Sequence, residues 1–344
     1  MIAAEHSVLE MGRLPVLVAA FALVAAIILV STRIAHHAEI LASKVGDPYG
    51  TMILTLAAVL VEVVVLAIMM QGETSPTLVR DTIYAAVMLD INGILGLAAL
   101  LGGIRHGEQP YNDDSARTYG VMILTAMGIS MVVPEFVPRE SWHVYSAFTI
   151  GAMIALYALF LRMQVGAHSY FFSYAYPRAE RKGSLPSEAT GESEPATVSI
   201  VIIIVGVVLI GALAEVMSVL LGAGLKGSGA PPALMAVVVA AISAAPEILT
   251  AMRAALANRM QSVVNIAMGA SLSTVILTVP VMEAIALYTG QPFIMAMSPA
   301  QTVMVAITLI VAAINLNDGE TNAIEGMTHF ILFATFIMLT LIGL

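Results

Sequence analysis

Glu62 and Glu247 are the residues of this sequence whose positions point to chemistry. Glu62 lies about 12 residues into the apolar stretch Gly50–Gln71, or about 17 Å along a helix that would cross a 30 Å hydrocarbon layer. Glu247 lies near the middle of a second apolar stretch, within "SAAPEILTA". A charge at the centre of a bilayer costs about 2.5–3.5 kcal/mol on insertion scales. We therefore expect both carboxylates to line a central cavity and bind a metal cation; the alternative is a pair of neutral, hydrogen-bonded structural carboxyl groups.

Other residues near these two glutamates supply the oxygen ligands that hard cations prefer. They are Asp90, Asn92, Ser243, Ser271 and Ser273. Pro246 lacks a backbone donor and is predicted to open the helix just before Glu247. The freed carbonyl groups would then help to complete a coordination shell, as in the broken helices of transporters.

Three further acidic residues have weaker claims. Glu39 and Glu215 lie in similar contexts, "AEILASKVG" and "AEVMSVLLG", and are candidates for the path by which ions approach the site. Glu283 falls near the end of an apolar segment, where a solvated carboxylate costs little, so a structural role is expected.

Carboxyl groups inside a membrane also offer a way to couple two ions. Without a cation, a desolvated carboxyl group retains its proton, whereas a bound cation favours the ionised form. Proton and cation then compete for the same oxygen atoms. A carrier that changes conformation only when one of them is bound is an antiporter, and this is our mechanistic hypothesis.

The composition restricts the class of protein. The 344-residue chain has a mean hydropathy of +0.94 and is 59% hydrophobic and 11% charged, which is too apolar for a soluble domain and predicts an integral membrane protein in contact with lipid. The net charge of -9 argues against nucleic acid as a partner. The chain has no cysteine and none of the common hydrolase or nucleotide-binding motifs, so we expect inorganic cations as partners, no cofactor and no enzymatic activity.

About ten apolar segments are long enough to span a bilayer. They run over Leu14–Thr32, Thr51–Met70, Thr82–Leu101, Thr118–Val137, Val144–Leu161, Val198–Leu221, Ala233–Met252, Val263–Leu287, Ile294–Ile314 and Gly326–Leu344. A polar stretch rich in Pro, Gly, Ser and charge, residues 162–196, divides them into residues 1–161 and 197–344, with five segments each. The predicted fold class is an all-α membrane protein built from two inverted five-helix repeats, because an odd number of helices reverses the second half.

Positive charge predicts the orientation. Ten of the 14 Lys and Arg residues lie in the loops that follow the first, third, fifth and seventh segments, whereas the loop after the ninth segment, on the same side, has acidic residues and no Lys or Arg. By the positive-inside rule these loops, and the linker 162–196, are cytoplasmic, and both termini lie outside.

Four stretches, taken together, resemble bacterial calcium/proton antiporters of the cation/calcium exchanger superfamily, including the sodium (potassium)/proton antiporters of the inner membrane. They are "GGIRHGEQPYN" (Gly102–Asn112), "LYALFLRMQVGAHSYFF" (Leu156–Phe172), "SAAPEILTAMRAALANRMQSVVNIAMGASLS" (Ser243–Ser273) and "NDGETNAIEG" (Asn317–Gly326). The resemblance implies ten or eleven helices, an essential Glu in each repeat at Glu62 and Glu247, and export of a cation against an inward flow of protons.

The sequence also departs from that family. Many relatives have G-N-x-x-E before each essential Glu, whereas this chain has "AAVLVE" and "SAAPE", and Ser273 stands where relatives have an amide. The preferred ion, Ca²⁺ or else Na⁺ or K⁺, is therefore left open, as are stoichiometry and oligomeric state. Two alternatives to cation/proton antiport are a sodium/calcium exchanger and an uncoupled cation channel.

Overall fold

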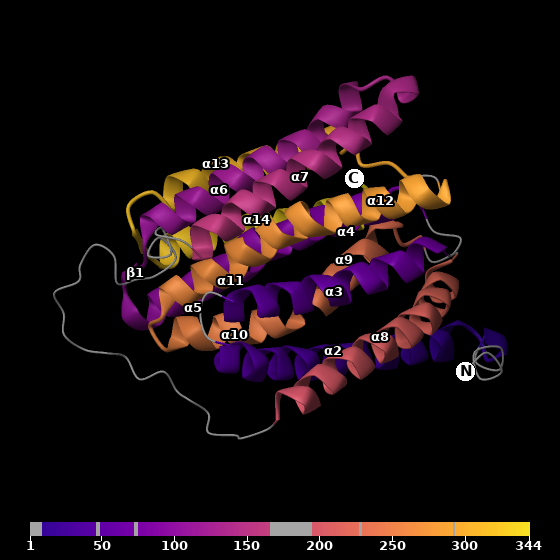
Figure 1. The fold of residues 1–344 in the computed structure, drawn as a ribbon, viewed down its shortest axis with the longest axis horizontal. Coiled ribbons are helices and arrows are strands. Elements are labelled where there is room, and N and C mark those ends of the chain that lie inside the picture. The colour runs from indigo at the N-terminus through magenta and orange to yellow at the C-terminus, as the bar shows by residue number, and fades with distance from the viewer. Residues whose placement is uncertain (1–8, 46–48, 72–74, 166–194, 227–228, 292) are drawn as a thin grey trace.

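Apolar helices make up most of the part of the chain that the computed structural model describes, which is residues 9–45, 49–71, 75–165, 195–226, 229–291 and 293–344. The helices lie side by side along the long axis of the molecule (Figure 1). Most of the predicted linker, 162–196, falls outside the described residues.

The first half contains five spans. Its elements are α2 (Arg13–Val45), α3 (Tyr49–Gln71), α4 (Leu78–Met88), η1 (Leu89–Leu95), α5 (Gly96–His106), β1 (Gln109–Pro110), α6 (Asp113–Met127), η2 (Gly128–Val132), η3 (Val133–Phe136), η4 (Arg139–Ser141) and α7 (Trp142–Val165). The elements α4, η1 and α5 form one continuous span, Leu78–His106, with the π-helical η1 in its middle.

The second half has a similar succession of helices, although its short strand follows the fourth span rather than the third. Its elements are α8 (Ala196–Leu225), α9 (Ala233–Ser243), α10 (Ala245–Leu256), α11 (Met260–Ser273), η6 (Thr274–Thr278), α12 (Val279–Thr289), α13 (Pro299–Asn315), β2 (Glu320–Thr321) and α14 (Ala323–Leu341). Its third span, Met260–Thr289, again has a π-helical segment, η6, in the middle. A π-helical turn is rare and concentrates at functional sites, so its presence in both third spans relates the two halves.

The predicted ten segments correspond to the observed helices. Within the described residues, eight helices are long and apolar enough to span a membrane, the bent pair α9–α10 forms a ninth span, and α13, with 17 residues, is a shorter apolar helix. The first helix is longer than predicted, because α2 continues through "AHHAEILASKV" to Val45. The fold is therefore the predicted all-α membrane fold of two inverted five-helix repeats.

Contacts between the halves are reciprocal, as an inverted repeat requires. The first helices, α2 and α8, pack against each other, and each also contacts the second span of the other half (Figure 1). The last helix of the second half, α14, packs along η1 and α5, and the last helix of the first half, α7, packs along η6 and α12. Each third span therefore lies between elements of both halves.

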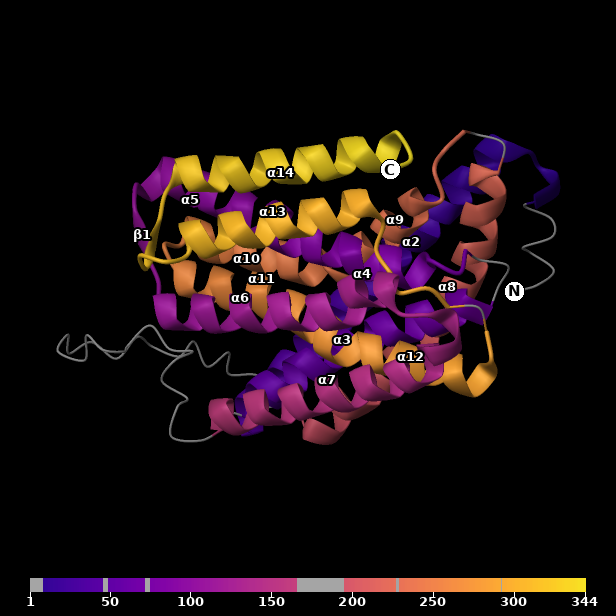
Figure 2. The ribbon, with the colours of Figure 1, turned by 90° about the horizontal axis from the view of Figure 1, so that it is seen from above.

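The loops gather at two opposite ends of the bundle. At one end β1 pairs with β2 in an antiparallel register, Gln109 opposite Thr321, and Gln109 Nε2 donates to the backbone oxygen of Ala255 at 3.0 Å. At the other end the Ile294 amide donates to the Pro76 carbonyl at 3.0 Å. The start of α2 and the end of α14 also share one end, opposite β1 (Figure 2). Loops therefore alternate between ends, as ten spans require.

Candidate cation site

Glu62 is held in the middle of α3 by two hydroxyl groups from the other half of the chain. Its side chain is 4% exposed, and Oε2 accepts hydrogen bonds from Thr274 Oγ1 at 3.1 Å and Thr278 Oγ1 at 2.9 Å. The other oxygen, Oε1, is buried and has no hydrogen-bond partner among the described residues. One carboxylate oxygen is thus fixed in place, while the second remains available to a ligand.

Glu247 lies at the break predicted from Pro246. The helix stops at Ser243, turns through 57° at Ala244 and restarts as α10, with Pro246 and Glu247 in its first turn. Oε2 of the Glu247 carboxyl group is buried without a hydrogen-bond partner in the described structure. The first turn of a helix presents unpaired N–H groups and a partial positive charge, so it stabilises a carboxylate there.

Asp90 adds a third acidic group, from the π-helical η1. It is 2% exposed, and its Oδ2 accepts a hydrogen bond from Ser271 Oγ on α11 at 3.1 Å. Its charge interacts with those of Glu247 and Glu62, and these two glutamates also interact with each other. The structure therefore brings Glu62, Glu247, Asp90 and Ser271 into one region, between elements of both repeats.

Asn92 faces a different set of residues. Its amide nitrogen donates to Thr308 Oγ1 on α13 at 2.7 Å, and its Oδ1 lies 3.0 Å from Nδ1 of His329 on α14. His329 is 3% exposed, and its Nε2 has no partner within the described residues. Asn92 thus ties the π-helical turn that carries Asp90 to the last two helices.

The remaining predicted residues are not bonded to a carboxylate. The Ser243 hydroxyl donates to the Ala240 carbonyl at 3.0 Å, and the Ser273 hydroxyl donates to the Ala270 carbonyl at 2.9 Å, each within its own helix. Ser243 directly precedes the break at Ala244. Glu39 on α2 and Glu215 on α8 both have exposed side chains on the helices that begin each repeat.

Two features of the site differ from the sequence-based predictions. Thr278 was absent from the predicted ligands, although its place one turn after Thr274, on the same helix face, is a signal that the sequence contains. Glu283 was expected to be solvated, but it is 2% exposed and its Oε2 lies 2.5 Å from Thr149 Oγ1 on α7. That expectation is corrected because α7 packs against α12 and covers this carboxyl group.

No basic side chain neutralises the acidic cluster in the described part of the chain. The salt bridges there join Arg80 to Asp81 and Arg117 to Asp113, both away from Glu62, Asp90 and Glu247. Across the described residues, no three His, Asp or Glu side chains are close enough to form a ready-made metal cluster. Ligation would therefore combine carboxylates with hydroxyl and backbone oxygen atoms, a mixture that suits hard cations.

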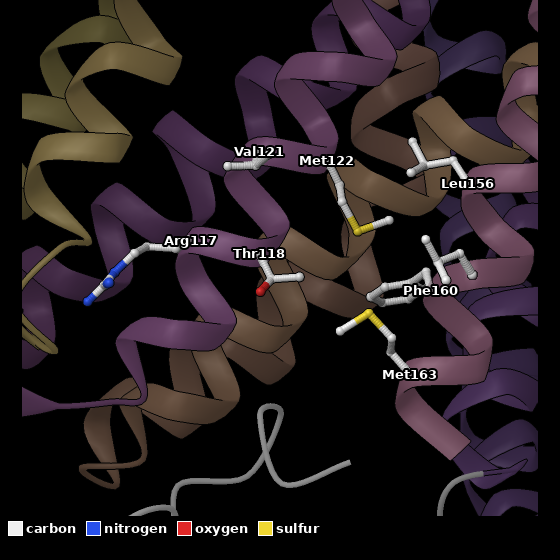
Figure 3. Close-up of a pocket in the computed structure, with 8 residues that line it drawn as sticks. Arg117, Thr118, Val121, Met122, Leu156, Phe160 and Met163 are labelled. Carbon is white, nitrogen blue, oxygen red and sulfur yellow. The ribbon is translucent and has the colours of Figure 1, made fainter. Parts of the chain in front are cut away.

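A surface hollow between α6 and α7 does not compete with this site. It is lined mainly by apolar side chains, among them Met122, Leu156 and Phe160, with Arg117 at one side (Figure 3). It contains no carboxylate, so it offers no anionic ligand for a cation.

Comparison with known proteins identifies the family. The model of the protein family described as "sodium/calcium exchanger protein" matches residues 15–166 and 198–342 of this chain. The chain belongs to the sodium/calcium exchanger protein family. It is 32% identical over 315 residues to the putative ionic transporter y4hA of Sinorhizobium fredii (strain NBRC 101917 / NGR234), covering 89% of this chain and 84% of that protein.

Two further similarities agree with this family. The chain is 30% identical over 307 residues to the sodium-potassium/proton antiporter ChaA of Escherichia coli (strain K12), again covering 89% of this chain and 84% of the relative. The solved structure of native YfkE superposes with a TM-score of 0.75 at 17% identity and covers 99% of this chain and 98% of that one. The chain is thus a multi-pass membrane ion exchanger rather than an enzyme.

Proposed function

We propose that this exchanger is a secondary active antiporter that exports Ca²⁺ in exchange for H⁺, with Glu62 and Glu247 binding cation and proton in turn. The observation that carries the proposal is a pair of buried carboxylate oxygens without hydrogen-bond partners, Glu62 Oε1 and Glu247 Oε2, one from each repeat. A buried carboxylate oxygen without a partner is costly, and either a proton or a metal cation removes that cost. Because both use the same oxygen atoms, binding of one displaces the other.

The surrounding groups support a cationic substrate. The charge of Asp90 interacts with those of Glu62 and Glu247, and Ser271 donates a hydrogen bond to Asp90. We assign Ser243, which ends α9 just before the break, as a further neutral oxygen ligand. Three interacting carboxylates that form no salt bridge with Lys or Arg among the described residues favour a divalent ion. We assign Asn92 and Ser273, whose polar groups are bonded elsewhere, to the layer around these ligands, and Glu39 and Glu215 to the approach path.

The relatives are named for different transported ions. YfkE is described as a Ca²⁺/H⁺ antiporter, whereas ChaA is a sodium-potassium/proton antiporter. Na⁺ and K⁺ therefore remain alternative substrates at the same carboxylates.

We also infer the arrangement in the membrane. The proposed repeats are residues 1–161 and 197–344. The linker 162–196 faces the cytoplasm, and both termini lie on the opposite, outer side of the inner membrane. The asymmetric distribution of Lys and Arg among the loops supports this orientation.

Transport by purified protein in liposomes tests the proposal. With a pH-sensitive dye inside, added Ca²⁺, Na⁺ or K⁺ should dissipate an imposed proton gradient in the presence of wild-type protein. Glu62→Gln and Glu247→Gln should each reduce exchange at least a hundredfold, because the amide cannot bind both ions, while Glu140→Gln, at an exposed carboxylate, should transport normally. No response to any of the three cations would refute the proposal.

The same liposomes distinguish the alternatives. Ca²⁺ flux that follows a sodium gradient when protons are equilibrated by an uncoupler would indicate sodium/calcium exchange. Flux that is fast and independent of any counter-ion would indicate a channel.

A further inference from the structure

Glu283 is a buried acidic group that the exchange mechanism above does not use. It lies on α12, is 2% exposed, and contacts Thr149 of α7 across the interface between these two helices. Neither of the salt bridges formed among the described residues involves it. A carboxyl group in a membrane span without a basic partner is costly when ionised, so it is best explained by a bound proton.

The hydrogen-bond geometry at Thr149 agrees with that explanation. Its Oγ1 lies 2.9 Å from the Ser146 carbonyl oxygen and 2.5 Å from Glu283 Oε2. A hydroxyl group has a single hydrogen, and a carbonyl oxygen has none to contribute. If the Thr149 hydroxyl donates its hydrogen to the Ser146 carbonyl, it has none left for Glu283. The 2.5 Å contact is then a hydrogen bond only when the Glu283 carboxyl group is protonated and donates to Thr149 Oγ1.

Along the axis of the span formed by η6 and α12, Glu283 lies between the level of the cation site and one end of the bundle. It is five residues, about 7 Å, from Thr278, which holds Glu62, and six residues, about 9 Å, from the end of α12 at Thr289. That end is the one shared by the loops before α4 and α13. Thr149 is seven residues from the start of α7 at the same end.

The titratable groups around Glu283 are few. Tyr145, on α7, interacts with its charge, and α3, which also packs against α12, contributes Glu62. The adjoining η6 presents the hydroxyls of Thr274 and Thr278, both directed to Glu62. No basic group faces Glu283 from these described elements, so a proton is the positive ion that this place suits.

We propose that Glu283 and Thr149 form a proton-binding site, distinct from the cation site, that supplies the counter-transported proton to Glu62. Glu283 takes up one proton from the aqueous phase at its end of the bundle and becomes a neutral carboxylic acid. It returns to the carboxylate when that proton leaves for Glu62, which becomes neutral as its cation departs. This inference rests on the proposed cation/proton antiport.

Two modes of transport in the same liposomes test it. Exchange of external Ca²⁺ for internal radiolabelled Ca²⁺ needs no proton, whereas Ca²⁺ uptake driven by a pH gradient does. Glu283→Gln should slow the proton-driven mode at least tenfold and leave the Ca²⁺/Ca²⁺ mode within twofold of wild type. Thr149→Val should slow the proton-driven mode by a smaller factor, and Thr340→Val, which removes a buried hydroxyl bonded within its own helix, should change neither mode.

The outcomes separate cleanly. Normal proton-driven exchange in Glu283→Gln, or an equal loss of both modes in correctly folded protein, would overturn the inference. If Glu283→Gln does not fold, Thr149→Val undergoes the same comparison, and normal proton-driven exchange or an equal loss of both modes in that variant would overturn the inference. Wild-type protein that performs Ca²⁺/Ca²⁺ exchange without any proton-driven mode would instead refute the proposed function.

Discussion

At the scale of single residues, the two glutamates proposed to bind the cation, Glu62 and Glu247, have unlike surroundings. Glu62 Oε2 receives two hydroxyl hydrogen bonds from the second repeat, whereas Glu247 lies in the first turn of α10, at the positive end of that helix. Hydroxyl donors stabilise the charged form of a carboxyl group. We infer that the hydrogen bonds from Thr274 and Thr278 favour the ionised form of Glu62, which is the form that binds a cation.

Thr278→Val tests this role. The change removes a hydrogen bond to a charged group, which contributes about 1.5–3 kcal/mol, and so favours the protonated form of Glu62 over the cation-bound form. We expect the KM for the cation to rise about tenfold or more at neutral pH and to recover partly at higher pH, where fewer protons compete. Transport rates in liposomes over a range of cation concentration and pH provide the measurement.

A matched substitution controls for the loss of a buried hydroxyl. Thr340 is 4% exposed and donates to the Phe336 carbonyl of its own helix, so Thr340→Val should leave the cation KM unchanged. An unchanged KM in Thr278→Val would show that the hydroxyl merely fills space.

Residue types alone predicted much of this site but not its pairings. Glu62, Glu247 and Asp90 stand out because charge is rare and expensive within an apolar segment. Threonine and serine are common in such segments, so the spacing of Thr274 and Thr278 by one helical turn becomes informative only once η6 is seen to pack against α3. Burial of Glu283 by α7 depends likewise on a helix more than 100 positions away in the chain, which local sequence does not specify.

At the scale of elements, small residues allow the third and last spans to approach closely. A Cβ atom at Gly326 of α14 would lie 2.2 Å from the backbone nitrogen of Leu100 on α5, and one at Gly103 would lie 2.3 Å from that of Ala323. These contacts are with backbone atoms, so only a displacement of the helices relieves them. The close packing holds η1, and hence Asp90, against α14.

Gly326→Ala should therefore destabilise the protein. Forcing two tightly packed backbones apart typically costs about 1–3 kcal/mol, which should appear as a lower melting temperature of the detergent-solubilised protein. Gly151→Ala on α7 is the control, because a Cβ atom there meets nothing within 4 Å and alanine is the better helix former. Equal melting temperatures for the two variants would contradict this account.

The elements differ in how well sequence foretells them. Pro246 predicts the break before α10, because proline has no backbone N–H donor and its ring clashes with the preceding helical turn. Nothing comparable marks η1 or η6, and the partners of Asp90 and Asn92 in η1 come from helices distant in the sequence. Hydropathy located the ten segments well, but it ended the first one early, since the polar "AHHAE" resembles a loop until α8 covers it.

At the scale of the whole molecule, the two ends of the bundle are assembled from loops distant in sequence. One end joins β1, β2 and the turn after α10, and the other joins the loop before α4 to the loop before α13. Positive charge assigns the loop of β1 and the turn after α10 to the same side, whereas the loop of β2 carries no Lys or Arg and is assigned to that side by its pairing with β1. The loop contacts and the distribution of charge have one cause: the chain reverses direction at every span, so successive loops lie at opposite ends of the bundle.

Single cysteines can assign the two ends to the two sides of the membrane. The chain has no cysteine, so a membrane-impermeant maleimide reports only on an introduced one. Glu108 and Ser75 are exposed and lie at opposite ends, beside β1 and before α4. In intact cells Ser75→Cys should be labelled, whereas Glu108→Cys should be labelled only after the membrane is permeabilised. The opposite pattern would place the linker outside and reverse the direction of transport, and labelling of both in intact cells would contradict the alternation of spans on which the inverted repeat depends.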